Sequence, residues 1–218
     1  MQYQEVAVVI GNGESRSILD LESLRTTVTL IGCNAIHRDL LVDHLVCCDN
    51  RMVKEVVGRK KSRKLANIYT RERYFKDFKM IDDSGRVKLL PELPYNGLLK
   101  PDQAEHWGSG PYAVLLAAAL KFKCVYIIGF DLHGNNHLVN NLYKDTPNYL
   151  SSNKPAVDPA YWIYQLKKVF AYHPDVQFKI FNFYNWACPS EWRLDNVTVF
   201  DINKFNIELA KEVNTLYN

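Results

Sequence analysis

The sequence predicts an α/β fold: a single domain, residues 1–218, built on one doubly wound, mostly parallel sheet of the Rossmann-like type, with a small lid-like excursion. Short apolar runs alternate with helix-like segments along the chain, which is the rhythm of β-α-β units. The run CVYIIGFDL at 124–132 is continuously apolar, as is typical of a strand in the middle of a parallel sheet. With 47% hydrophobic residues, the chain can bury the core that such a domain needs.

The first part of the chain contains three predicted strands and two predicted helices. The apolar runs at 5–10, 28–32 and 44–48 are short and lie between polar or glycine residues, which favours buried strands. A short helix is expected at 15–25 and a second helix at 50–57. These segments alternate as successive β-α units would.

The middle of the chain is expected to be less regular. The stretch 74–107 carries the turn signals DDSG, LPELP and NG, which interrupt periodicity and predict an irregular insertion. Residues 109–122 then predict a buried helix, because Pro111 falls in the first turn, where its missing N–H is harmless, and alanines and leucines follow.

Beyond the central strand the segment 133–158 is rich in Asn, Ser and Pro, so we expect a lid loop there. A helix at about 160–173 and a strand at 176–183 follow. The ligand of such a fold is expected at the carboxyl ends of the strands.

Composition argues against several classes of protein. No apolar run approaches the roughly 20 residues of a membrane span, and the amino-terminal segment lacks the features of a secretory signal. The five cysteines lack zinc-ligand spacing, which favours free thiols and a cytoplasmic location. We therefore expect no metal site and no cofactor. The absence of a D-x-D triplet slightly favours a nucleotide monophosphate sugar, or a metal-free mechanism, over a UDP-sugar.

Positive charge is concentrated in one stretch. Residues 51–76 include ten Lys or Arg and two acids, a local charge of +8 in a chain of net charge +3. The run GRKKSRK at 58–64 is its densest part. A solvated helix face is the more common reason for such a run, and contact with a nucleic acid is the alternative.

The first predicted strand ends in a Gly-Asn-Gly turn. Gly11 and Gly13 would let a phosphate or sugar approach the backbone at a helix start, and Asn12 and Ser15 would add polar side chains. Arg16 stands where the dinucleotide-binding pattern has its third glycine, and the P-loop pattern is missing. The alternative is that the glycines only permit a tight corner.

Further polar residues follow the other predicted strands or begin a helix. Because the carboxyl ends of parallel strands meet at one rim, we expect these residues to face the first turn and form a nucleotide pocket. They are Asn34 after the second strand, Asp49 and Asn50 after the third, Ser109 and Gly110 at a helix start, and Gly129 and Asp131 at the end of the central strand.

The motifs VVIGNGES, GCNAI and GSGPYAVLLAAALKFKCVYIIGFDL together resemble the bacterial sialyltransferases of the lipooligosaccharide type. They are also similar to a related group of archaeal and bacterial proteins that includes a pterin diphosphokinase. The resemblance covers roughly residues 5–50 and 105–145. It implies a nucleotide domain that binds the CMP part of CMP-sialic acid, and an inverting transfer of the sugar to a glycan hydroxyl.

The resemblance also implies roles for single residues. Gly11, Asn12 and Gly13 would approach the phosphate and ribose, Asn34 would contact the nucleotide, and Ser109 with Gly110 would bind cytidine or phosphate.

The catalytic residues are less well defined by the resemblance. Tyr143 stands about where the family has a lid tyrosine that stabilises the departing phosphate, and His133 lies in the region of another. The family's general-base histidine has no counterpart, because no histidine occurs between 138 and 172. His133 or Asp158 could replace it, although Asp158 before Pro159 is also a common helix start.

Three functions therefore stay open at this point. The first is a nucleotide-sugar-dependent glycosyltransferase with a nucleotide-sugar donor and a glycan acceptor. The second is a phosphoryl- or diphosphoryl-transfer enzyme on the same scaffold. The third is a non-catalytic protein that binds a nucleotide, or a nucleic acid through 58–64.

Overall fold

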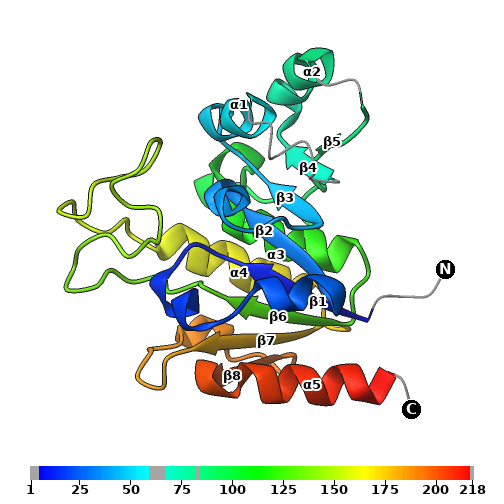
Figure 1. The fold of residues 1–218 in the computed structure, drawn as a ribbon, viewed down its shortest axis with the longest axis vertical. Helices are drawn as coiled ribbons and strands as arrows, with labels where there is room; N and C mark the ends of the chain where they lie inside the picture. Colours follow the sequence, from blue (N-terminus) through cyan, green and yellow to red (C-terminus); the bar gives the residue numbers. More distant parts are fainter. Residues whose placement is uncertain (1–4, 59–66, 82–83, 217–218) are drawn as a thin grey trace.

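The computed structural model describes residues 5–58, 67–81 and 84–216. Its strands form one parallel sheet in the order β5-β4-β3-β2-β1-β6-β7-β8 (Figure 1). The predicted α/β, Rossmann-like fold is confirmed. The strands are β1 (Val6–Ile10), β2 (Thr29–Cys33), β3 (His44–Val46), β4 (Asn67–Thr70), β5 (Val87–Leu89), β6 (Cys124–Ile128), β7 (Gln177–Asn182) and β8 (Val197–Asp201). The α-helices are α1 (Asn50–Gly58), α2 (Glu72–Ile81), α3 (Ser109–Ala119), α4 (Ala160–Tyr172) and α5 (Phe205–Leu216).

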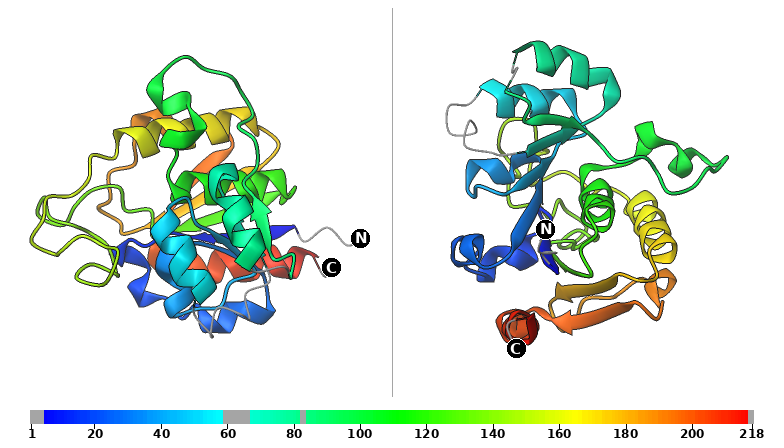
Figure 2. Two further views of the ribbon diagram at one scale, coloured as in Figure 1. Left: turned by 90° about the horizontal axis from the view of Figure 1, so that it is seen from above. Right: turned by 90° about the vertical axis from the view of Figure 1, so that its right-hand side faces the viewer.

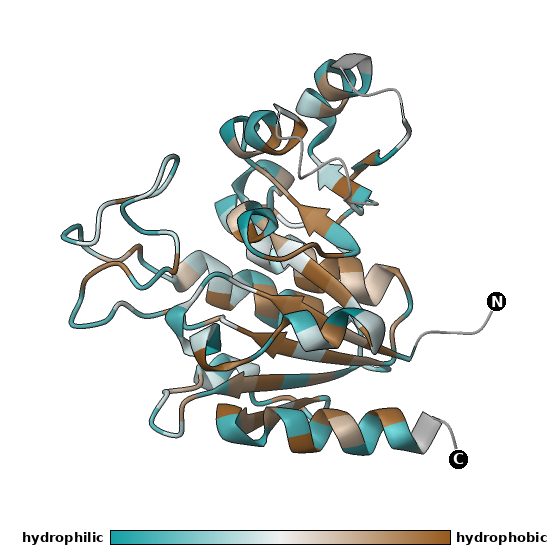
Figure 3. Cartoon of the chain, in the orientation of Figure 1, coloured by the Kyte–Doolittle hydropathy of each residue, from teal (hydrophilic) through white to brown (hydrophobic). Residues whose placement is uncertain are grey.

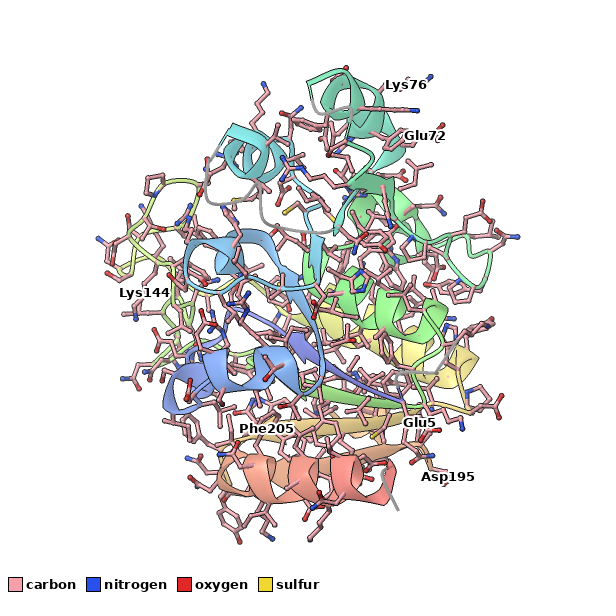
Figure 4. All side chains as sticks on the ribbon, turned by 45° about the vertical axis from the view of Figure 1, so that its right-hand side comes forward. Glu5, Glu72, Lys76, Lys144, Asp195 and Phe205 are labelled. Carbon is pink, nitrogen blue, oxygen red and sulfur yellow. The ribbon has the colours of Figure 1, made fainter. Side chains whose placement is uncertain are left out.

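The central strands are buried on both faces. Every residue of β1, β2 and β6 is buried, because helices cover the sheet on its two sides (Figure 2). Helices α3 and α4 pack on one face, and α1 and α5 pack on the other. Figure 3 shows the strands as the most hydrophobic part of the chain, while α5 alternates apolar and polar residues along its length. Phe205, the fully buried first residue of α5, anchors that helix to the sheet (Figure 4).

The strand order creates a switch point between β1 and β6. From β1 the chain moves outward through β2, β3 and β4 to β5, and then crosses back to β6, on the other side of β1. In the register of the sheet Val8 lies between Leu30 and Tyr126. Crossovers leave β1 and β6 toward opposite faces, so a crevice opens at the carboxyl ends of these two strands.

The predicted helix at 15–25 is wrong. The structure has two short 3-10 segments there, Glu14–Ile18 and Glu22–Thr26. Ser15 and Arg16 are buried polar residues, and their side chains bond to other parts of the chain instead of facing solvent on a helix surface. The hydrogen bonds that Ser15 and Arg16 make to other parts of the chain therefore outweigh helix propensity at this turn.

The stretch 74–107 is more regular than the turn signals indicate. It contains most of α2 and all of β5, and the DDSG signal marks the connection between them, where Gly85 has a φ of +77°. After β5, the chain to Trp107 forms two 3-10 turns. No helix in the described part of the chain is long and apolar enough to cross a bilayer.

The loop 133–158 is tied to the body of the domain through Arg38. Its guanidinium pairs with both carboxylate oxygens of Glu55 on α1, at 2.7 Å each, and donates to Thr146 Oγ1 at 2.6 Å. Asn148 also donates to Glu55, at 2.9 Å. Lys144 forms a further ion pair with Glu14 beside the end of β1 (Figure 4). The loop is therefore held against two separate elements.

Acid should weaken this attachment. Burial alone would raise the pKa of Glu55, but hydrogen bonds from Arg38 and Asn148 outweigh it and lower the pKa from 4.5 to about 2. Because the folded-state value is the lower one, the stabilisation is complete above about pH 4.5 and is lost as the pH falls through about 2. Glu55→Gln should reduce the free energy of unfolding at pH 7 by about 2–3 kcal/mol, and urea denaturation should show this deficit shrinking toward pH 3.

Glu22→Gln is the matched control. Glu22 pairs with Arg25 at 3.2 Å, but its side chain is 60% exposed, so its loss should change stability little at any pH. If the loss in free energy of unfolding caused by Glu55→Gln stayed constant from pH 7 to 3, the link between stability and the lowered pKa of Glu55 would be contradicted.

Candidate functional site

A cavity of about 370 Å³ opens at the switch point. Its walls are the carboxyl ends of β1, β2, β3 and β6, the amino terminus of α3 and the loop 133–158. The volume lies within the range of small-molecule sites, roughly 300–1,000 Å³. Ten of the predicted site residues line it: Gly11, Asn12, Gly13, Asn34, Asp49, Ser109, Gly110, Gly129, Asp131 and His133.

The Gly-Asn-Gly turn uses most of its backbone donors within the protein. The N–H groups of Gly11 and Gly13 donate to Ile128 O and Gly129 O, both at 2.8 Å. Those of Glu14 and Ser15 donate to side chains, at 2.9 Å each. Only the N–H of Asn12 has no acceptor among the described residues, and no α-helix follows, so the turn lacks the several free N–H groups of a phosphate cradle. The geometry favours the alternative of a tight corner.

Both glycines of the corner are required by close packing. A Cβ on Gly11 would lie 2.3 Å from Gly129 O, and one on Gly13 would lie 2.4 Å from Asp131 Cγ. Gly13 has a φ of −65°, so its backbone conformation would suit any residue. Space is the constraint, because the ends of β1 and β6 approach too closely for any side chain.

Asp131 joins the two strand ends. Its carboxylate accepts hydrogen bonds from the backbone N–H and the hydroxyl of Ser15, and Asn182 Nδ2 lies 3.4 Å away. Trp186 donates to Asp131 O at 2.8 Å. Ser15 itself does not line the cavity, so the structure gives it a bracing position rather than the predicted contact position.

Asn34 is held by a chain of hydrogen bonds. Cys48 N donates to Ser109 Oγ at 2.9 Å, and the Ser109 hydroxyl donates to Asn34 Oδ1 at 2.8 Å. A hydroxyl has one proton, so this arrangement fixes Oδ1 toward Ser109. The Asn34 amide N–H₂ has no acceptor among the described residues and is available to a ligand.

The amino terminus of α3 is the second source of donors. The first N–H groups of a helix have no partner within it, and Ser109 and Gly110 find no other acceptor in the described part of the chain. Arg71 holds this terminus in place, because it donates to Trp107 O at 2.6 Å and to Cys48 O at 3.0 Å. Arg71 therefore fixes the α3 wall and the β3 wall together.

Tyr149 is a cavity residue that the sequence did not single out. Its hydroxyl accepts from Asn12 Nδ2 at 3.1 Å and from Ala35 N at 3.3 Å, which leaves its own proton without an acceptor among the described residues. Asn12 Oδ1 is buried and has no hydrogen-bond partner there. Trp162 and Asn140 also line the cavity. No sequence motif marks these residues, since they come from a loop and a helix face.

Tyr143 lies behind the cavity wall and does not line it. It is 4% exposed, its hydroxyl accepts from Arg16 Nη2 at 3.0 Å, and its ring packs 5.6 Å from that of Tyr149. Burial raises the pKa of Tyr143. Tyr149, six residues later, lines the cavity instead, and the role of a lid tyrosine stays a prediction.

Two further predicted residues lie outside the cavity. Asp158 is exposed, and its Oδ1 accepts from Ala160 N at 2.9 Å at the start of α4, so the helix-start alternative is the one observed. Asn50 begins α1 and is half-buried. In contrast, His133 is exposed and lies between the cavity and a smaller hollow beside the end of β7.

The cavity wall is acidic. Asp49 and Asp131 line it, and no Lys or Arg is among its lining residues in the described ranges. Burial raises the pKa of the Cys33 thiol, which also lines the cavity, to about 12, so that thiol is neutral. The described residues contain no group of three His, Cys, Asp or Glu that could hold a metal ion. Of the basic run 58–64, all but Gly58 lies outside the described residues.

Solved sialyltransferase structures share this fold, whereas no family model and no curated protein matches the chain. The monofunctional alpha-2,3-sialyltransferase Cst-I from Campylobacter jejuni has a TM-score of 0.57 at 17% identity, covering 93% of this chain and 83% of that one. An alpha-2,3-sialyltransferase from Campylobacter jejuni in apo form has a TM-score of 0.57 at 15% identity, covering 100% and 97%. The sialyltransferase CstII, in complex with the substrate analogue cytidine-5'-monophosphate, has a TM-score of 0.54 at 14% identity, covering 91% and 86%. The predicted resemblance to sialyltransferases is confirmed at the level of the fold.

The corner can be tested for its steric role. Gly13→Ala should lower the free energy of unfolding by about 1–3 kcal/mol, because the added methyl group would displace Asp131 and its bonds to Ser15. Gly58→Ala is the control, since a Cβ there meets nothing within 4 Å. Urea denaturation of both variants makes the comparison, and equal stability of the two would contradict the close-packing argument.

Proposed function

We propose that the chain is a glycosyltransferase that takes a sugar from a CMP-type nucleotide donor and transfers it to a glycan hydroxyl. The observation that carries the proposal is a cavity, lined at several points by polar side chains, at the switch point of a fold shared with sialyltransferases, one of which was solved with cytidine-5'-monophosphate. The switch point is where open α/β sheets bind nucleotides.

The cavity offers both the hydrogen-bond donors and the hydrogen-bond acceptors that a nucleotide needs. In the proposal, the amide N–H₂ of Asn34 and the first N–H groups of α3 bind the phosphate or the base, and the Asp49 carboxylate accepts from ribose hydroxyls. The unpartnered Asn12 Oδ1 accepts a further ligand hydroxyl or amino group. A buried acceptor without a donor is costly, so a ligand donor at this atom would contribute to affinity.

The transfer step requires a base and a stabilised leaving group. His133 is the proposed base, since this residue lines the cavity and Asp158 is committed to α4. It removes the proton of the acceptor hydroxyl as that oxygen bonds to the anomeric carbon, and the bond from this carbon to the phosphate oxygen breaks to release CMP. The Tyr149 hydroxyl donates to the phosphate as its charge develops. The proposal assigns no metal ion or cofactor to this step.

Nucleotide binding is the first test. CMP at millimolar concentration should raise the melting temperature, because a ligand that binds only the native state stabilises it. Asn34→Ala should abolish most of the shift, since it removes the free amide donors. Asn203→Ala serves as a control, because Asn203 is exposed and bonds only to Asp201 in the described chain. No shift with CMP or any other nucleotide would overturn the proposed function.

Hydrolysis of CMP-sialic acid tests the catalytic roles without knowledge of the acceptor. His133→Asn should lower the rate by about 10²–10⁴-fold, as for loss of a general base, and Tyr149→Phe by about 10- to 10³-fold, as for loss of an oxyanion donor. CMP affinity should change much less than the rate in either variant, because both interactions are strongest in the transition state.

Asp158→Asn is the matched control for this assay. Asp158 lies outside the cavity, and Asn can accept the same helix-start bond. This variant should hydrolyse the donor at close to the wild-type rate. Turnover of ATP with magnesium, without hydrolysis of CMP-sialic acid, would instead favour a phosphoryl-transfer enzyme.

A further inference from the structure

Arg16 is a buried cation that has no anionic partner among the described residues. It is 6% exposed. Its Nε donates to Gly11 O at 2.8 Å, its Nη2 donates to Tyr143 OH at 3.0 Å, and its guanidinium carbon lies 5.8 Å from the centre of the Tyr143 ring. No carboxylate in the described part of the chain forms an ion pair with it, whereas the half-buried Arg38 has Glu55.

Such a placement is unfavourable for the protein alone. A charge taken out of water loses its hydration, and neutral hydrogen-bond partners restore only part of it. The carbonyl of Gly11 and the hydroxyl of Tyr143 are neutral. An apolar residue would fill the space beneath the corner without this penalty, so the retained charge points to an interaction that the protein does not itself supply.

The guanidinium lies directly beneath the cavity wall. Gly11, which accepts from Arg16, lines the cavity, and so does Gly129, whose missing Cβ would lie 3.1 Å from Arg16 Cδ. The charge also acts on a third lining residue: it lowers the pKa of the Cys33 thiol, against the stronger effect of burial. Two wall residues, Gly11 and Gly129, therefore adjoin Arg16, and its charge also acts on Cys33.

The charges around the cavity indicate which effect Arg16 would have on a ligand. A bound anion would face the carboxylates of Asp49 and Asp131, and no Lys or Arg among the described residues lines the wall to offset them. Glu14 nearby is neutralised by Lys144, and Asp39 interacts with Tyr143. Arg71, behind the opposite wall, is already bonded to three carbonyls and is partly exposed, so water screens its charge more.

We propose that Arg16 is an electrostatic positioning residue that gives the cavity its preference for a phosphate-bearing ligand without touching that ligand. The inference rests on the proposed function in one respect, that the ligand is a nucleotide. Arg16 offsets the two wall carboxylates through the thin layer formed by Gly11 and Gly129. The phosphate is thereby placed over the junction of β1 and β6.

Isothermal titration with CMP and with cytidine, which lacks the phosphate, separates the effect of Arg16 on the ligand's charge from its effect on the shape of the cavity. Arg16→Gln keeps an N–H donor for Gly11 and removes the charge, so it should weaken CMP on the order of tenfold and cytidine by less than about twofold. Arg16→Lys keeps the charge and should keep the ratio of the two affinities close to that of the wild type. Arg25→Gln removes one charge from the exposed surface of the same segment and should change neither affinity.

The outcomes distinguish this inference from the proposed function. Equal weakening of CMP and cytidine by Arg16→Gln would show a purely structural role and overturn the inference alone. A wild-type protein that binds neither CMP nor cytidine would overturn the proposed function itself.

A measurement on the wild type covers variants that fail to fold. The second phosphate pKa of free nucleotides is about 6, and phosphorus NMR can follow it in CMP bound to the protein. A positive field from Arg16 should lower this pKa on binding. A pKa that is unchanged or raised would show that the wall carboxylates dominate, and would overturn the inference.

Discussion

The close approach of β1 and β6 at their carboxyl ends is the constraint on which the rest of the site depends. Two glycines allow it, since a Cβ at either would collide with the backbone or side chain that follows β6. Asp131 then locks the approach by bonding to Ser15. The N–H groups of Gly11, Gly13 and Ser15 are used in this bracing, so most ligand donors come from elsewhere on the rim. Asn34 and the amino terminus of α3 supply them.

Polar side chains that are buried or half-buried do most of the positioning around the cavity. Ser109 connects Cys48 to Asn34, Arg71 connects the wall after β3 to the start of α3, and Tyr149 connects Asn12 to Ala35. Each link joins elements that are distant in sequence. Networks of this kind are specific because every unpaired member is costly in a low-dielectric interior. The members left without a partner among the described residues, Asn12 Oδ1, the Asn34 amide N–H₂ and the Tyr149 hydroxyl proton, lie where a ligand would be expected.

The sequence predicted the sheet well because its central strands are buried on both faces and read as apolar runs. The rim residues followed from the same reasoning, since the carboxyl ends of parallel strands must meet. The short strand β4 beside the basic run, and β5 within a stretch of turn signals, gave no such pattern. Helix α5 has a clear signal, with Phe205, Leu209 and Val213 at four-residue spacing and packed on the core, but no strand was predicted beyond 183 to lead to it.

The loop residues could not be predicted for a different reason. Tyr143 and Tyr149 are alike in sequence context, and only the path of the loop decides which ring faces the cavity. That path is set by Arg38 with Glu55 and by Lys144 with Glu14, pairs far apart along the chain. Likewise, the roles of Ser15 and Asp158 follow from their hydrogen-bond partners, which spacing alone does not reveal.

The hydrogen bonds of the Arg71 guanidinium have a consequence for how the ligand specificity of such a site can change. Because one side chain ties the wall after β3 to the start of α3, these two walls form a single rigid unit with the sheet. The remaining wall is one continuous loop, 133–158, attached by a few side-chain pairs. Surface loops tolerate changes of length far better than the elements they connect. New ligand shapes can therefore be accommodated by exchanging this one segment, while the rigid side keeps its chemistry, which makes the loop the natural unit for transplantation between proteins of this fold.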